Sequence, residues 1–171
     1  IRFVSEFKAY KKAREFFIEH KEYTHLVIAT DDIVVHPKHI ERLQMKLENS
    51  DYPVYSGMMN VEQTDVENRN ICYKIGMKER ALRKYEWIQK SDITEKYLTV
   101  EFAGFGLTAI RRDIVEGYPI FAADKVFQGF PPHRGASLDF VFCWYCKDKG
   151  IPIIADTTID MKHLRKSGTH R

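Results

Sequence analysis

Two neighbouring carboxylates, Asp31 and Asp32, follow directly on the apolar run Leu26–Thr30. A β-branched apolar run of this length is typical of a buried strand, and ligands of open α/β sheets bind just beyond the carboxyl ends of strands. Adjacent carboxylates repel each other unless a cation or hydrogen-bond donors compensate their charge. A divalent cation that holds a phosphate group is the simplest compensation, and oxygen ligands suit Mg²⁺ or Mn²⁺. Since the next helix is expected to open at Pro37, both acids lie too early to cap it, which favours a functional role.

Two further positions carry side chains that could complete such a site. Asp139 opens the helix expected over 137–149, where an acid is also favoured by the helix dipole, so a catalytic and a purely local role are both open. His163 follows the last expected strand and is flanked by the basic residues Arg165 and Lys166. Imidazole can complete an oxygen-rich metal site, and Lys or Arg can neutralise a leaving diphosphate, although a surface histidine and a solvated tail would look the same.

The composition is that of an ordinary globular chain of 171 residues, long enough for one domain with a hydrophobic core. Its formal net charge of +3 is too balanced to indicate a nucleic-acid partner. No stretch has the apolar length of a membrane span and no signal peptide opens the sequence, so we expect a cytoplasmic protein without an integral membrane segment. Among the three cysteines, Cys143 and Cys146 lie in an apolar, helix-like run, where packed thiols are favoured over a redox or zinc site.

The pattern of apolar residues alternates between helix and strand periods, which predicts a single α/β domain over 1–171. Helices are expected over 6–20, 37–49 and 137–149. Strands are expected over 25–30, 53–58, 97–102, 107–110, 151–155 and 159–164. The polar segments 60–70 and 122–136 are interpreted as loops, and 165–171 as a mobile basic tail. The segment 71–90 is ambiguous, because 71–75 suits a strand and 79–89 suits a short helix.

Taken in order, these features resemble a known family. Val27–Pro37 gives a strand that ends in an acid pair, and Gly104–Arg112 gives a glycine-interrupted strand that ends in Arg-Arg. An acid, Asp139, then opens a helix that Gly150 ends, and a strand leads to His163. This set resembles the GT-A fold glycosyltransferases, in particular the compact, stemless family-2-like enzymes of prokaryotes and viruses, including archaeal viruses.

The sequence departs from that family in three places. Thr30 replaces the first acid of a strict D-x-D motif, and Leu138 replaces the Glu of the usual Glu-Asp pair. The strands with which the family holds the nucleotide base would lie before Ile1 or be only partly present. The resemblance therefore implies an unusually short or an N-terminally trimmed member.

The resemblance implies a GT-A-like, Rossmann-related central mixed sheet flanked by helices. It implies a metal-dependent, hexosyltransferase-type enzyme that moves a sugar from a UDP- or GDP-sugar to a hydroxyl of a glycan, protein or lipid, in the host cytoplasm if the protein is viral. It implies that Asp32 and His163 are ligands of Mn²⁺ or Mg²⁺, and that Asp31 contacts the donor ribose or a metal-bound water. Asp139 would be the catalytic base of an inverting transfer. Arg165 and Lys166 would form a flexible lid, and Gly104 and Phe105 would lie close to the sugars.

Two alternatives of other kinds remain open. A nucleotidyltransferase also uses an acid pair at a strand end with a metal, and it would release pyrophosphate instead of a nucleoside diphosphate. A catalytically inactive domain that binds sugars or nucleotides would retain binding without turnover, and the replacements at Thr30 and Leu138 favour it. A metal-dependent hydrolase is a weaker third hypothesis, because the sequence shows no second set of ligands for a two-metal centre.

Overall fold

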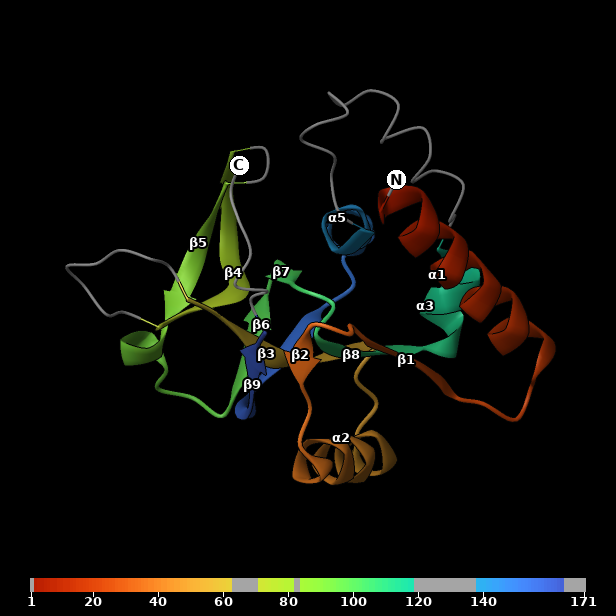
Figure 1. The fold of residues 1–171 in the computed structure, drawn as a ribbon, viewed down its shortest axis with the longest axis horizontal. Coiled ribbons are helices and arrows are strands. Elements are labelled where there is room, and N and C mark those ends of the chain that lie inside the picture. Colours follow the sequence, from red (N-terminus) through yellow and green to blue (C-terminus); the bar gives the residue numbers. More distant parts are fainter. Residues whose placement is uncertain (1, 63–70, 82–83, 119–137, 165–171) are drawn as a thin grey trace.

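The computed structural model describes residues 2–62, 71–81, 84–118 and 138–164. Its strands form one nine-stranded mixed sheet with helices on both faces (Figure 1). The helices are α1 (Arg2–Glu19), α2 (Pro37–Asn49), α3 (Arg112–Gly117), α5 (Leu138–Asp148) and a 3₁₀ turn, η1 (Lys90–Asp92). The strands are β1 (His25–Ala29), β2 (Ile33–Val34), β3 (Val54–Glu62), β4 (Ile71–Ala81), β5 (Lys84–Gln89), β6 (Tyr97–Val100), β7 (Phe102–Ala103), β8 (Leu107–Arg111) and β9 (Ile153–His163).

The mixed sheet flanked by helices is thus confirmed, and the helices lie close to their expected bounds. Helix α2 begins at Pro37 as the sequence predicts, and His36 is its N-cap, with the ring Nδ1 accepting a hydrogen bond from the Lys38 amide at 3.2 Å. In the described part of the chain, no helix combines the length and the apolar character needed to cross a bilayer.

Three strands of the sheet run in the same direction. β8 pairs antiparallel with both β1 and β3, so β1 and β3 point the same way, and β3 pairs in parallel with β9. The carboxyl ends of β1, β3 and β9 therefore meet at one edge of the sheet, while β2, β4 and β6 pair antiparallel with their neighbours. This is the edge at which an open α/β sheet binds its ligands.

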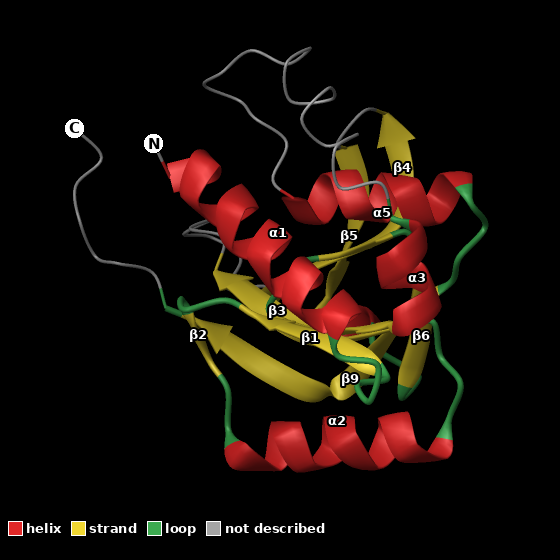
Figure 2. Ribbon diagram, turned by 90° about the vertical axis from the view of Figure 1, so that its right-hand side faces the viewer, coloured by secondary structure: helices red, strands yellow, loops and turns green. Residues whose placement is uncertain are grey.

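Helices cover both faces of the sheet (Figure 2), and a cluster of buried apolar side chains lies on each face. On one face, Phe17 of α1, Val115 of α3 and Phe142 of α5 belong to one buried cluster. On the other face, Leu43 of α2 belongs to a second cluster with Met59 and other residues of β3, β8 and β9. The alternation of side chains along β3 and β9 supplies both clusters, since successive residues of a strand point to opposite faces.

The sequence-based alternatives for 71–90 are settled in favour of strands. Of the residues 79–89, considered as a short helix, 79–81 belong instead to β4 and 84–89 to β5, and the two strands pair antiparallel with Gly76 opposite Trp87. Figure 1 shows this hairpin rising from the sheet on the side away from α1. The helix interpretation failed because the apolar spacing over so short a segment fits both periods, and it does not reveal the pairing of Glu79 with Tyr85.

The segments 151–155 and 159–164, expected as separate, form the single strand β9 with a bulge between them. Along β3, Gly57 pairs with Asp156 but the next residue, Met58, pairs with Asp160, so three residues of β9 stand out of the ladder. Gly57 makes this possible, because a Cβ there would lie 2.5 Å from Ile159 Cγ2.

The buried carboxylate of Asp156 holds the bulge in place. Its Oδ1 accepts hydrogen bonds from the Thr158 amide at 2.8 Å and from the Thr158 hydroxyl. Its Oδ2 accepts one from Arg42 Nε of α2 at 2.9 Å and another from the Tyr55 hydroxyl of β3. The side chain is fully buried, so these donors replace the water that an ionised carboxylate would otherwise require.

We expect Asp156→Ala to lower the free energy of unfolding by about 3 kcal/mol, because it leaves Arg42 and the Tyr55 hydroxyl without their acceptor. Urea unfolding followed by circular dichroism measures this change. Asp148→Ala is the matched control, since that carboxylate is 78% exposed, and it should change stability by less than about 0.5 kcal/mol. Equal losses in both variants would contradict a special role for Asp156.

The same carboxylate makes stability depend on pH. Burial alone would raise the pKa of Asp156, but the donors from Thr158, Tyr55 and Arg42 outweigh burial and hold its pKa below the usual range. In acid the unfolded chain therefore binds this proton more readily than the folded chain. The contribution of Asp156 is complete above the ordinary carboxyl pKa and is lost as the pH falls through the lowered folded pKa. The free energy of unfolding, measured from pH 2 to pH 6, should depend more steeply on pH in the wild type than in Asp156→Asn. The same pH dependence in both proteins would contradict this expectation.

Candidate functional site

The shared edge of β1, β3 and β9 brings together residues that lie far apart in the sequence. Asp31 and Asp32 follow β1, and His163 is the last residue of β9. The short strand β2, which comes directly after the acid pair, places Ile33 opposite His163 in the β2–β9 ladder. The chain folds this way because β2 continues the apolar pattern after the turn and its Ile33 is buried against the face that α2 covers.

Asp32 and His163 are in direct contact. The Nε2 atom of His163 lies 3.2 Å from Oδ2 of Asp32, and the Leu164 amide donates to the Asp32 carbonyl oxygen at 2.6 Å. Both side chains keep an open side, with 33% of Asp32 and 26% of His163 exposed. The pair predicted from sequence as metal ligands is therefore assembled, from opposite ends of the chain, at a place that a ligand can reach.

The surroundings favour the ionised form of Asp32. Burial on its own would raise the pKa of Asp32, but the neighbouring Thr30 hydroxyl and the His163 imidazole lower it, and the net shift is downward. The Thr30 hydroxyl lies near the carboxylate without meeting hydrogen-bond geometry, so it contributes by its dipole. A carboxylate that stays ionised well into acid is suited to hold a cation.

The donor set fits a divalent cation that shares its coordination with a substrate. Two ligands bound at right angles, each about 2.1 Å from Mg²⁺, lie about 3 Å apart, close to the separation of Asp32 Oδ2 and His163 Nε2. Within the described ranges, no group of three or more His, Cys, Asp or Glu side chains is arranged around a point that could hold a metal. The two side chains can therefore supply two ligands, and Mg²⁺ characteristically takes its remaining ligands from phosphates and water.

Polar atoms without partners gather at the same edge. Six buried side-chain polar atoms of the described residues lack a hydrogen-bond partner, and three of them are Thr30 Oγ1, Asn60 Oδ1 and His163 Nδ1. These three lie at or just past the carboxyl-terminal parts of β1, β3 and β9. A buried polar atom without a partner costs about 1–3 kcal/mol, and a bound ligand is one way to supply the bonds that these three atoms lack.

Asn60 is the residue that the sequence did not single out. It stood in a polar segment interpreted as a loop, whereas β3 in fact extends through it to Glu62. It pairs with Lys162 of β9, the neighbour of His163. The available signal was the polar residue that ends the apolar run of a central strand, the same signal that singled out Asp31 and Asp32.

The glycine turn after β7 lies beside the end of β1. The Thr30 amide donates to the Gly106 carbonyl oxygen at 3.3 Å, which fixes the turn next to the acid pair. Phe105, in contrast, is 8% exposed and packs with Tyr10 at 6.4 Å and Phe142 at 5.5 Å between ring centroids. The structure thus places the Phe105 ring in the core, and only the backbone of Gly104–Gly106 borders the strand end.

Asp139 lies in the first turn of α5 and is 4% exposed. Its Oδ1 accepts a hydrogen bond from the Phe140 amide at 2.9 Å, as an acid at a helix start often does. It does not project into solvent as a plain surface acid would. Ser137, expected to cap this helix, and the tail residues Arg165 and Lys166 lie outside the described residues. Asp31 is exposed in the turn after β1.

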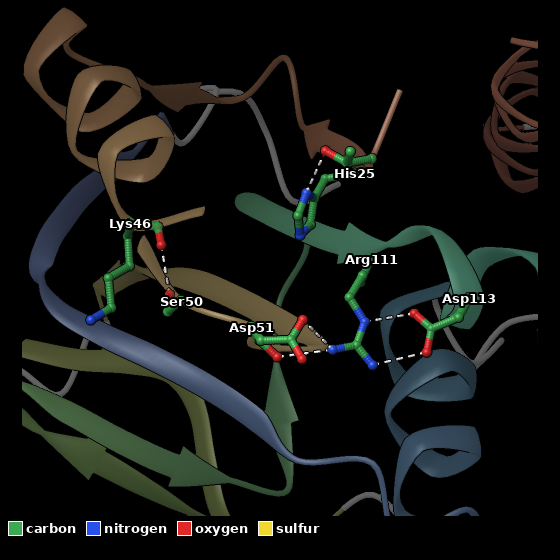
Figure 3. A network of polar contacts seen from close by, with 7 residues as sticks. His25, Lys46, Ser50, Asp51, Arg111 and Asp113 are labelled. Atoms are coloured by element: carbon green, nitrogen blue, oxygen red, sulfur yellow. Dashed lines mark hydrogen bonds and ion pairs between the residues drawn. The ribbon is translucent and has the colours of Figure 1, made fainter. Parts of the chain in front are cut away.

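The two arginines of the Arg-Arg segment serve the fold. Figure 3 shows Arg111 between two acids, with its Nη1 2.8 Å from Asp51 and its Nε 2.7 Å from Asp113. Arg112 donates to the carbonyl oxygens of Phe17, His20 and Tyr23, at 2.6 to 3.0 Å, and so caps the carboxyl end of α1. Both side chains are committed to these structural partners.

A groove of about 1170 Å³ lies elsewhere, along the outer edge of β1. Its walls include Val27 of β1, Leu47 of α2 and the ion-paired Arg111, and none of the residues predicted to carry chemistry lines it. The geometry therefore separates this groove from the strand-end residues, and chemistry is better supported at the strand ends.

Comparison with known proteins supports the fold. No protein-family model and no curated protein matches the chain. Among solved structures it is similar to A197 from STIV, with a TM-score of 0.57 and 17% identity, over 94% of this chain and 68% of A197. It also resembles the inositol-1-phosphate CTP transferase from T. maritima, with a TM-score of 0.44 and 11% identity, over 89% of this chain and 54% of that enzyme. The first likeness shows a shared fold, and the second is too distant to support an argument.

We expect Asn60→Leu to leave the free energy of unfolding unchanged or to raise it by about 1 kcal/mol, because it removes an unpaired buried acceptor and keeps the side-chain shape. Thr108→Val is the matched control, since the Thr108 hydroxyl is bonded to Ser56 Oγ at 2.8 Å and its loss should cost about 1 kcal/mol. Chemical denaturation of the two variants compares them directly. A loss in Asn60→Leu as large as in the control would show that Asn60 is a structural residue.

Proposed function

We propose that the protein is a metal-dependent glycosyltransferase of GT-A type that moves a sugar from a nucleoside-diphosphate donor to an acceptor hydroxyl. The observation that carries the proposal is the contact between Asp32 and His163 at the common carboxyl end of three strands that run in the same direction. The order of motifs along the sequence supports the same assignment. The likeness to A197 supports the fold alone.

In this proposal Asp32 and His163 hold Mn²⁺ or Mg²⁺, and Asp31 orients the donor ribose or a metal-bound water. The bound cation would neutralise the negative charge that develops on the departing nucleoside diphosphate. Thr30 and Asn60 offer the strand-end polar atoms that lack a partner, which suits donation from sugar hydroxyls or water. The backbone of Gly104 borders the same end, and Arg165 and Lys166 are proposed to close over the diphosphate.

Asp139 acts as the general base. It accepts the proton of the acceptor hydroxyl while the hydroxyl oxygen forms a bond to the anomeric carbon and the bond from that carbon to the diphosphate oxygen breaks. Attack from the side opposite the leaving group inverts the anomeric centre. The burial of Asp139 supports this role, because a base kept from bulk water favours transfer to the acceptor over hydrolysis of the donor.

Metal binding can be tested without turnover. We expect Mn²⁺ to bind the protein, with Asp32→Asn and His163→Gln each weakening binding about tenfold or more. The electron paramagnetic resonance signal of free Mn²⁺ during a titration measures the affinity. Asp148→Asn, on an exposed helix position, is the control that should bind as wild type does. Unchanged Mn²⁺ affinity in both site variants would rule out this pair as the ligands.

The activity is tested by incubating the full chain with a panel of UDP- and GDP-sugars, with Mn²⁺, Mg²⁺ or EDTA, and measuring nucleoside diphosphate released. We expect release that depends on the metal, is lost in Asp32→Ala, and falls about 10²–10⁴-fold in Asp139→Asn. Asp148→Asn should retain full activity. Release of pyrophosphate from nucleoside triphosphates would instead indicate a nucleotidyltransferase, and nucleotide binding without turnover would indicate a binding domain.

A further inference from the structure

A second group of polar side chains lies next to the bulge of β9, seven residues before His163. Tyr97, the first residue of β6, is paired with Asp156 in the β6–β9 ladder. The Lys46 ammonium of α2 lies 4.3 Å from the centre of the Tyr97 ring, and the Lys96 ammonium lies 5.3 Å from it. Arg42, one helical turn before Lys46, reaches the same place and bonds to Asp156. We call Arg42, Lys46, Lys96 and Tyr97 the β6 cluster.

The β6 cluster is held in position by contacts of its own. Lys46 also lies 5.2 Å from the centre of the Tyr52 ring, so its ammonium is placed against two aromatic rings. Tyr52 stacks on Tyr55 with ring centroids 5.8 Å apart and an angle of 4° between the planes. The Tyr55 hydroxyl in turn bonds to Asp156. The backbone of Lys96 is fixed as well, since its carbonyl oxygen accepts a hydrogen bond from the Thr157 amide at 3.0 Å.

Positive charge in the cluster exceeds the negative charge that faces it. The carboxylate that contacts the cluster, Asp156, is buried and already accepts hydrogen bonds from three side chains. Neither Lys46 nor Lys96 forms an ion pair with a carboxylate of the described residues. Arg42 and Lys46 are four residues apart on one helix, a spacing at which like charges destabilise the helix. Arg42 is balanced by Asp156, so the positive charges without a carboxylate partner among the described residues are those of Lys46 and Lys96.

The Tyr97 hydroxyl responds to this excess. Its slight burial would raise the pKa of Tyr97, but the neighbouring Lys96 and Lys46 ammonium groups outweigh burial and lower it. Three cationic groups and one hydroxyl donor meet at a surface that solvent reaches.

We propose that the β6 cluster is a binding site for a phosphate group, separate from the strand-end site. A tetrahedral oxyanion carries enough acceptor oxygens to meet Arg42, Lys46, Lys96 and the Tyr97 hydroxyl at once, whereas a carboxylate offers only two oxygens. A dianion also neutralises the two lysines that lack a counter-ion. The site lies on the face of the sheet that α2 covers, and it shares no residue with the Asp32–His163 pair. Its Tyr97 is paired with Asp156, seven residues before His163 in β9.

The test uses the full chain with ¹³C-labelled tyrosine, and the Tyr97 ring signal is assigned by its loss in Tyr97→Phe. Inorganic phosphate is titrated against sodium chloride of matched ionic strength at neutral pH. We expect a saturable shift of the Tyr97 signal with phosphate and none with chloride. Lys46→Gln and Lys96→Gln should each weaken phosphate binding about tenfold. Lys149→Gln, which removes the same charge at an exposed position outside the cluster, should bind as wild type does.

Three outcomes would overturn the proposal. A shift that grows linearly with phosphate, or that chloride reproduces, would mean ionic screening without a site. A saturable shift with sodium acetate of the same midpoint would mean a carboxylate site. Binding unchanged in both glutamine variants would place the phosphate elsewhere. Because both lysines are on the surface, retained circular dichroism of the variants separates lost binding from lost folding, and the phosphate titration is independent of any test of sugar transfer.

Discussion

The structure depends on one buried carboxylate, Asp156, and the break in β9 that it stabilises. The long last strand must pair with β6 at its start, with β3 along its length and with β2 at its end. A regular strand would carry His163 three residues out of its observed register against β3. The bulge after Asp156 takes up those three residues. The Asp156 carboxylate accepts hydrogen bonds from Thr158 in the bulge, from Tyr55 of β3 and from Arg42 of α2, so it connects the three elements. Asp156 lies seven residues before His163 in β9, and the bulge that it stabilises sets the register that brings His163 beside Asp32.

Two aspartates show how surroundings decide between a structural and a chemical role. Asp156 is fully buried and its oxygens are saturated by donors from Arg42, Tyr55 and Thr158, so it has no capacity left for a ligand. Asp32 is one-third exposed and meets one side-chain partner, His163, which is itself a possible ligand of a cation. Both have a pKa held below the usual range, so the direction of the shift does not distinguish them. What distinguishes the two aspartates is access to solvent and the presence of carboxylate oxygens that lack hydrogen-bond donors.

The sequence predicted what depends on local pattern and missed what depends on distant pairing. The start of α2 at Pro37 and the strand before Asp31 follow from proline geometry and apolar periodicity, and both are observed. The meeting of Asp32 with His163 followed from the order of motifs. The hairpin of β4 and β5 did not, because the apolar spacing of so short a segment fits a helix and a strand equally well. The bulge of β9 and the roles of Asp156 and Asn60 did not either, because each is decided by a partner far along the chain. A single polar residue inside a strand pattern does not reveal which donors the fold will bring to it.

The distribution of satisfied and unsatisfied polar groups along β3 and β9 carries the functional argument one step further. At the amino-terminal half of β9, every oxygen of Asp156 is paired and the sheet is fastened to α2. At the carboxyl ends, Thr30, Asn60 and His163 each keep a buried polar atom without a partner. A fold that can satisfy a buried carboxylate with hydrogen bonds from four donors is able to satisfy a lone amide, so the unpaired atoms at the strand ends are not a limit of the packing. Tyr10, His25 and Tyr118 also keep a buried polar atom without a partner, so such atoms are not confined to the strand ends. The proposed ligand would account for the three at the strand ends, since groups aimed at a ligand cannot also be paired within the protein.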